Sequence, residues 1–82
     1  MRVEDRPHVA RAVWDAFCEK SHQLREPTCA EYYTLSGWLD QDIPLPVILR
    51  AFGEFNGTPR VLMAMEGPVE RANRYYRQAM AL

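Results

Sequence analysis

The sequence predicts an all-α protein, a compact bundle of four to five short helices forming a single helical domain over residues 1–82. Apolar residues recur at three- and four-residue spacing along most of the chain, and prolines and glycines separate these stretches. No run that alternates apolar and polar residues between turn signals indicates a strand. With 82 residues, of which 48% are hydrophobic and 26% charged, the chain has the composition of one globular domain.

The first helix is predicted from about Arg6 to about Gln23. Pro7 suits a first turn, because the missing N–H has no partner inside a helix there. One face is expected to carry the buried side chains of Ala10, Val13, Trp14, Phe17 and Leu24. Glu26-Pro27 then breaks the pattern.

A capping box predicts the start of the second helix. The Thr28 hydroxyl can accept from the backbone N–H three residues later, and the Glu31 carboxylate can accept in return. This helix should end near Asp40. Its buried stripe is expected to consist of Tyr32, Leu35, Trp38 and Leu39.

Two prolines, Pro44 and Pro46, mark the turn that leads into the third helix. Asn56-Gly57 should end it, since both residue types accept left-handed backbone. The amphipathic face of this helix contains Leu45, Ile48, Leu49, Phe52 and Phe55.

A threonine cap at Thr58, with Pro59 at the first helical position, predicts the start of a fourth helix carrying Val61, Leu62 and Met65. Gly67-Pro68 should kink or interrupt it. The apolar pattern then continues to the C-terminus through Val69, Ala72, Tyr75 or Tyr76, Ala79 and Met80.

The net charge of −1 hides an asymmetry along the chain. Residues 1–57 contain six Lys/Arg and nine Asp/Glu, whereas residues 58–82 contain four Arg and two Glu. This excess could attract an acidic partner but is far from the basic balance of a dedicated duplex-DNA binder. No apolar run approaches the roughly 20 residues that cross a bilayer, and the charged start differs from a secretory signal, so we expect a cytoplasmic protein without a membrane contact.

The two cysteines, Cys18 and Cys29, are too few for a disulfide framework and are expected to be free and largely buried. Together with His22 they could approach a zinc ion, but structural zinc needs four ligands and usually closely spaced cysteine pairs. Cys18, His22 and Asp15 could form a nucleophilic group, yet they share one helix whose other face must be core. We therefore predict no cofactor, no metal site and no enzymatic activity.

The C-terminal helix contains the one grouping typical of a nucleic-acid surface. Arginines three residues apart share a helix flank and can bind phosphate, while tyrosine rings can stack on the bases of a single strand. The candidate nucleic-acid-binding residues are Arg71, Arg74, Tyr75, Tyr76 and Arg77. The alternative is that one tyrosine is core, and that the arginines are solvated or pair with Glu66 and Glu70.

A second candidate surface would bind a protein. A bundle of this size has little interior, so some large apolar side chains should remain outside, where partner interfaces are enriched in aromatic residues and methionine. The candidate partner-binding residues are Tyr33, Trp38, Phe55 and Met63.

The order of motifs from Trp38 to Tyr76 resembles a known family. The matching residues are Trp38, Ile43-Pro44-Leu45, Val47-Ile48, Ala51-Phe52 and, after Asn56-Gly57-Thr58, the stretch from Val61 to Met65. In this order they resemble helical replication-initiation domains of the DnaD type and short helicase-loading modules, over less than half of the chain. The resemblance implies a role in DNA replication. The family's tyrosine-to-tryptophan motif, associated there with single-stranded DNA, is absent, and Arg74, Tyr75 and Tyr76 occupy roughly that region.

Together these observations predict a small helical adaptor subunit of a nucleoprotein assembly. It would bind a protein partner through apolar surface and nucleic acid through its C-terminal arginines. The alternative is a self-associating structural or regulatory protein, such as an inhibitor, with no nucleic-acid contact.

Overall fold

The computed structural model describes residues 3–81, and these residues form an all-α fold, as predicted. Four α-helices are joined by loops: α1 Arg6–Ser21, α2 Cys29–Asp40, α3 Leu45–Glu54 and α4 Glu66–Met80. Two short 3-10 turns, Val3–Asp5 and Leu62–Met65, precede α1 and α4. Over this described range there is no strand, and no helix is both long enough and apolar enough to span a bilayer.

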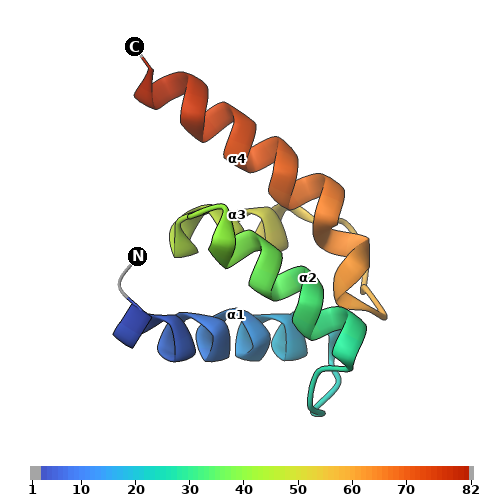
Figure 1. Cartoon of the computed structure of the whole chain (residues 1–82). Coiled ribbons are helices and arrows are strands. Elements are labelled where there is room, and N and C mark those ends of the chain that lie inside the picture. The colour runs from blue at the N-terminus through green and yellow to red at the C-terminus, as the bar shows by residue number, and fades with distance from the viewer. Residues whose placement is uncertain (1–2, 82) are drawn as a thin grey trace.

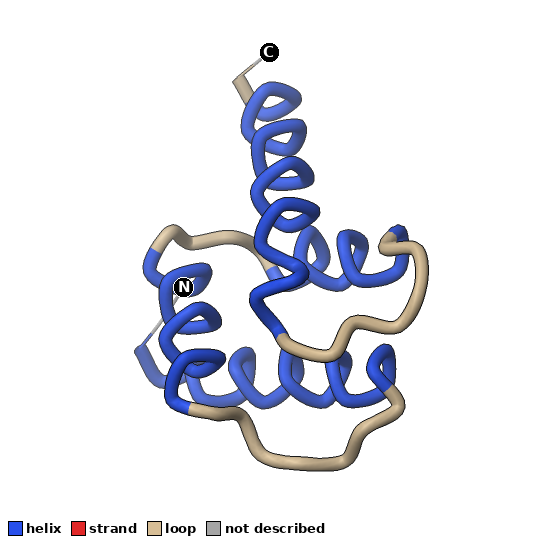
Figure 2. Tube along the Cα trace, turned by 90° about the vertical axis from the view of Figure 1, so that its right-hand side faces the viewer, coloured by secondary structure: helices blue, strands red, loops and turns tan. Residues whose placement is uncertain are grey.

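Helices α1, α2 and α3 form the body of the molecule, and α4 leaves it at an angle (Figure 1). The body has an aromatic centre. The ring centroid of Phe52 lies 6.4 Å from that of Phe17 and 6.1 Å from that of Trp38, and both ring pairs are edge to face. Turned by 90°, the molecule shows the second half of α4 extending away from the other helices (Figure 2). The core thus covers only the beginning of α4.

Helix α1 ends two residues earlier than predicted. His22 adopts a left-handed backbone with φ 57°, and its N–H bonds back to the carbonyls of Cys18 and Glu19. The chain therefore leaves the helical path before Leu24, which is 98% exposed. The prediction that Leu24 joins the buried face of the first helix is wrong for this reason.

Helix α2 begins and ends where the sequence predicts. Both hydrogen bonds of the capping box are present, from Glu31 N to Thr28 Oγ1 at 3.1 Å and from Thr28 N to Glu31 Oε1 at 3.0 Å. The buried stripe, however, runs through Glu31, Leu35 and Trp38. Tyr32, the residue after Glu31, lies about 100° further round the helix and is 59% exposed. The prediction that Tyr32 is buried is therefore wrong, and the Glu31 carboxylate takes that place in the core.

Helix α3 buries Ile48 and Phe52 as expected, while Leu49 lies at the edge of the face and is 39% exposed. The helix ends at Glu54 because Phe55 is already extended. Gly57 does adopt a left-handed backbone, with φ 94°, but it does so in the following loop.

The predicted helix start at Thr58-Pro59 is wrong. The chain stays non-helical through Val61, and a 3-10 turn over Leu62–Met65 leads into α4 at Glu66. The sequence also predicted a kink or interruption at Gly67-Pro68. The interruption lies between the 3-10 turn and α4, and Gly67-Pro68 falls just after it, in the first turn of α4.

Candidate functional site

The last ten residues of α4, residues 71–80, are called the arm below, and their C-terminal part projects from the body. The core-facing stripe of α4 runs through Val69, Asn73, Tyr76 and Met80, at alternating spacings of four and three residues that keep all four on one face. Val69 and Asn73 are buried, whereas Tyr76 is 39% and Met80 69% exposed. The stripe that packs on the core at the start of α4 therefore continues along the arm and becomes increasingly exposed toward Met80.

A groove runs between α3 and the arm and has a volume of about 570 Å³. Its short side chains are Val47, Ala72 and Ala79, and Tyr75 and Tyr76 contribute aromatic rings. The remaining lining residues are Arg50 and Glu54, which form an exposed ion pair at 2.9 Å. We call these seven residues the α3–α4 groove. An adjoining hollow shares Glu54, Ala72 and Tyr75 with it and adds Ala51, Phe55, Asn56, Pro68 and Arg71.

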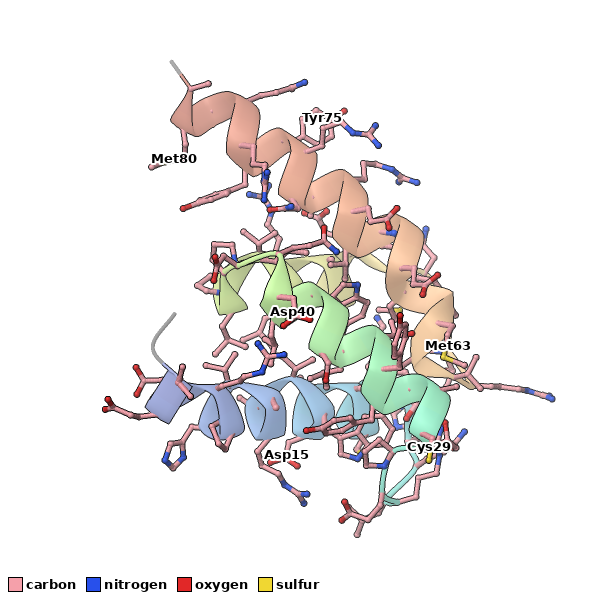
Figure 3. All side chains as sticks on the ribbon, viewed as in Figure 1. Asp15, Cys29, Asp40, Met63, Tyr75 and Met80 are labelled. Carbon is pink, nitrogen blue, oxygen red and sulfur yellow. The ribbon has the colours of Figure 1, made fainter. Side chains whose placement is uncertain are left out.

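The five candidate nucleic-acid-binding residues lie on the arm but do not form one surface. The Arg77 guanidinium turns toward α2 and donates to the Gln41 carbonyl at 3.1 Å. Tyr75 and Met80 lie on different sides of α4 (Figure 3). Arg71 and Arg74 are exposed, and among the described residues they form no ion pair or hydrogen bond, including with Glu66 and Glu70. Two arginines of the predicted group are thus unengaged and one is bound.

The four candidate partner-binding residues do not form one surface either. Tyr33 is 82% exposed on α2, and Phe55 and Met63 are half-buried. Trp38 is only 3% exposed, because its ring packs edge to face on Phe52, so it is a core residue and the expectation of a surface role for it is wrong. Only Phe55 lies beside the α3–α4 groove, in the adjoining hollow.

The most highly connected polar site was not predicted from the sequence. Arg25, in the loop between α1 and α2, uses all five of its N–H donors. Two form a bidentate pair with the Glu31 carboxylate at 2.6 and 2.8 Å. The others go to the Gln23 side chain and to the carbonyls of Glu26 and Arg60. One side chain therefore joins the loop, α2 and the segment before α4.

Glu31 is the buried half of this pair and has no exposed surface. Besides the two bonds from Arg25, it accepts from the backbone N–H of Thr28 and, at 2.9 Å, from that of Leu62. The hydrogen bond from Arg25 lowers the pKa of Glu31 to about 2, against the opposing effect of burial, with help from the two backbone donors. The same pair raises the pKa of Arg25 above its ordinary value.

Trp14 closes the other side of Arg25. Its indole N–H donates to the Arg25 carbonyl at 2.6 Å, and the guanidinium lies 5.2 Å from the ring centroid. The Cys18 thiol donates to the same carbonyl at 3.5 Å. Arg25, Glu31 and Trp14 are called the polar corner below. Its hydrogen bonds join the α1–α2 loop, α2 and the segment before α4, and so hold these three parts of the fold together.

The cysteine and histidine candidates do not assemble into a chemical centre. Cys18 is buried, as expected, but Cys29 is exposed at the start of α2, which corrects the expectation for that residue. Asp15, Cys18 and His22 line one shallow hollow, where Asp15 is bound to Arg11 and the thiol points to the Arg25 carbonyl. Over residues 3–81 no group of three or more His, Cys, Asp or Glu side chains is placed to hold a metal ion.

Comparison of the chain with protein-family models, curated proteins and solved structures found no match. Function must therefore be argued from the arm and the groove themselves.

Proposed function

We propose that the chain is a small non-enzymatic helical adaptor that binds a protein partner through the α3–α4 groove and the apolar face of the arm. The observation that carries the proposal is the change in burial along α4. Val69 at the start of the stripe is completely buried, whereas Met80 at its end is 69% exposed. A helix face patterned for a core but left uncovered is typical of a surface that another element covers.

The lining of the groove supports the same conclusion. A cavity of about 150 Å³ accommodates benzene, so a groove of about 570 Å³ has room for more than one apolar side chain. Ala72 and Ala79 leave that room, while Tyr75 and Tyr76 offer the large amphipathic rings in which interfaces are enriched. Phe55 extends the apolar surface into the adjoining hollow.

Photo-crosslinking in cells of the source organism would test the docking surface. We would replace Tyr75, 68% exposed in the groove, or Tyr33, 82% exposed on α2, by benzoylphenylalanine. A discrete protein adduct is expected from position 75 and not from position 33. An adduct from position 33 alone would place the partner on α2, and the absence of adducts from both positions would contradict the proposal.

A second function, contact with single-stranded nucleic acid, is favoured by the two unengaged arginines, Arg71 and Arg74. With both functions the adaptor would work in the cytoplasm within a nucleoprotein assembly, and the DnaD-type resemblance suggests DNA replication as the setting. A titration with oligothymidylate at several salt concentrations tests it. Replacing both arginines by alanine should reduce the slope of log K against log salt by about 1.4, because each phosphate contact on a single strand contributes about 0.7. Binding that is absent, or insensitive to salt, would leave only the protein-binding function.

A further inference from the structure

The buried apolar core belongs mainly to the body, which consists of α1, α2 and α3 (Figure 1). Of the fourteen buried hydrophobic side chains over residues 3–81, eleven lie between Val13 and Phe52. The other three are Leu62, Met65 and Val69, from the 3-10 turn and the start of α4. The body therefore has a core of its own, to which the last part of the chain contributes a small share.

The chain that joins α3 to this last part is suited to act as a hinge. Residues 55–59 form neither helix nor strand, and Gly57 adopts a left-handed backbone with φ 94°. The backbone groups of residues 56–59 bond to no other backbone group of residues 3–81. Regular structure therefore does not fix the path of this segment.

The polar corner fastens the chain just after the hinge. The Glu31 carboxylate accepts from the Leu62 N–H at 2.9 Å, at a buried position. Arg25 donates to the Arg60 carbonyl at 3.2 Å. A buried bond to a charged acceptor is among the stronger kinds of hydrogen bond.

Two further bonds tie α4 to the body, and both are exposed. Thr34 donates to the Glu66 carboxylate at 3.3 Å, and Arg77 donates to the Gln41 carbonyl at 3.1 Å. Water competes with such bonds, so their net contribution is small. The bonds of the polar corner are therefore the ones that hold the last part of the chain in place.

We propose that residues 60–81 form a lever, which leaves the body as one unit about the hinge at residues 55–59, and that the polar corner is its latch. When the lever opens, the bonds to Leu62 and Arg60 break. The pair between Arg25 and Glu31 stays intact, because both residues belong to the body. The α3–α4 groove has α3 on one border and α4 on the other, so it exists only while the latch is closed. The lever does not depend on the proposed docking function.

Hydrogen exchange of the folded protein, measured by NMR at urea concentrations below the unfolding transition, tests the lever. The amides of residues 70–73 in α4 should exchange through a shared opening that depends less on urea than the exchange of residues 13–17 in α1. Opening the lever exposes less surface than unfolding the whole chain, which is why the dependence should be smaller. If the two groups of amides exchange alike at every urea concentration, the chain opens only as a whole and the proposal is overturned.

Two substitutions in the capping box separate the latch from the start of α2. In Glu31→Gln the amide oxygen can still accept from the Thr28 N–H, since glutamine also serves in a capping box, but the N–H₂ group then faces the Leu62 N–H. Because that buried donor loses its acceptor, residues 70–73 should exchange at least tenfold faster.

Thr28→Ala is the matched control. It removes the hydroxyl that accepts from the Glu31 N–H and leaves the bonds of the latch in place. Residues 13–17 should exchange about fivefold faster, because the cap supports the whole fold. Residues 70–73 should change by less than about twofold, because the cap is present whether the lever is open or closed.

The remaining outcomes decide the role of the polar corner. If Glu31→Gln accelerates residues 70–73 no more than Thr28→Ala does, the polar corner is not the latch. If Glu31→Gln does not fold, Arg25→Lys replaces it, because an ammonium group lacks the fork that reaches both Glu31 and the Arg60 carbonyl. In that variant residues 70–73 should exchange at least threefold faster than in the wild type, and unchanged exchange would overturn the latch.

Discussion

The polar corner and the arm both place arginines near aromatic rings, and they use the guanidinium groups in opposite ways. Arg25 lies over Trp14 and uses every donor within the chain. Arg71 shares a hollow with Tyr75 and makes no contact of this kind among the described residues. The difference lies in what surrounds each group: buried acceptors around Arg25 and solvent around Arg71. Residue type alone does not separate an arginine that holds a fold together from one that is available to a ligand.

The sharpest way to break this comparison is to remove the buried carboxylate. Glu31→Gln is expected to lower the free energy of unfolding by about 3–5 kcal/mol, because it leaves Arg25 without its partner and places an amide N–H₂ against backbone donors. Urea denaturation measures the loss. The matched control is Glu54→Gln, which breaks the exposed pair with Arg50 and should cost less than about 1 kcal/mol. Similar losses in the two variants would show that the polar corner is no more important than a surface ion pair.

Acid should separate the two regions as well. The pKa of Glu31 is lowered from 4.5 to about 2 on folding, so its charged form stabilises the protein fully above about pH 4.5. That stabilisation, on the order of 3 kcal/mol, is lost as the pH falls from about 4.5 through about 2. Urea midpoints measured across this range should fall steeply in the wild type and in Glu54→Gln. A wild-type curve as shallow as that of Glu31→Gln would contradict the assignment.

A smaller effect is expected at the ring that covers Arg25. Trp14→Phe removes the 2.6 Å hydrogen bond from the indole N–H to the Arg25 carbonyl. Trp38→Phe removes a similar volume from the core, but the indole N–H of Trp38 donates to none of the described residues. The first variant should be less stable than the second by about 1 kcal/mol, the usual net value of one hydrogen bond. Thermal unfolding of the two variants provides the comparison, and equal stabilities would mean that the indole N–H contributes nothing.

Much of the fold could be predicted from local signals. The start of α2 follows from the capping box at Thr28 and Glu31, and the start of α3 follows from the prolines around it. The apolar spacing also identified Val13, Trp14 and Phe17 as core. These features depend on residues within one or two helical turns of each other, which is why a single sequence reveals them.

The errors share a different cause. Thr58-Pro59 has the local form of a helix start, but the Leu62 N–H bonds to Glu31, 31 residues away, and the Arg60 carbonyl accepts from Arg25. These long-range bonds accompany a non-helical segment, so the helix starts later. The capping box predicted the hydrogen bond from Thr28 N to the Glu31 carboxylate. It did not predict the other bonds that this carboxylate accepts, from Arg25 and from Leu62 N. In the arm, spacing placed the arginines on one flank, but only the structure shows Arg77 bound to the Gln41 carbonyl.

The smallest expected effect is on the arm, where the arginines are exposed. Replacing Arg71 and Arg74 together by alanine should change the free energy of unfolding by no more than about 0.5 kcal/mol, since neither guanidinium is bonded to a described residue. Arg77→Ala, which removes the bond to the Gln41 carbonyl, is the control and should cost slightly more. Urea denaturation of both variants measures the difference. A loss above about 1 kcal/mol in the double variant would mean that these arginines support the fold and are not free to contact nucleic acid.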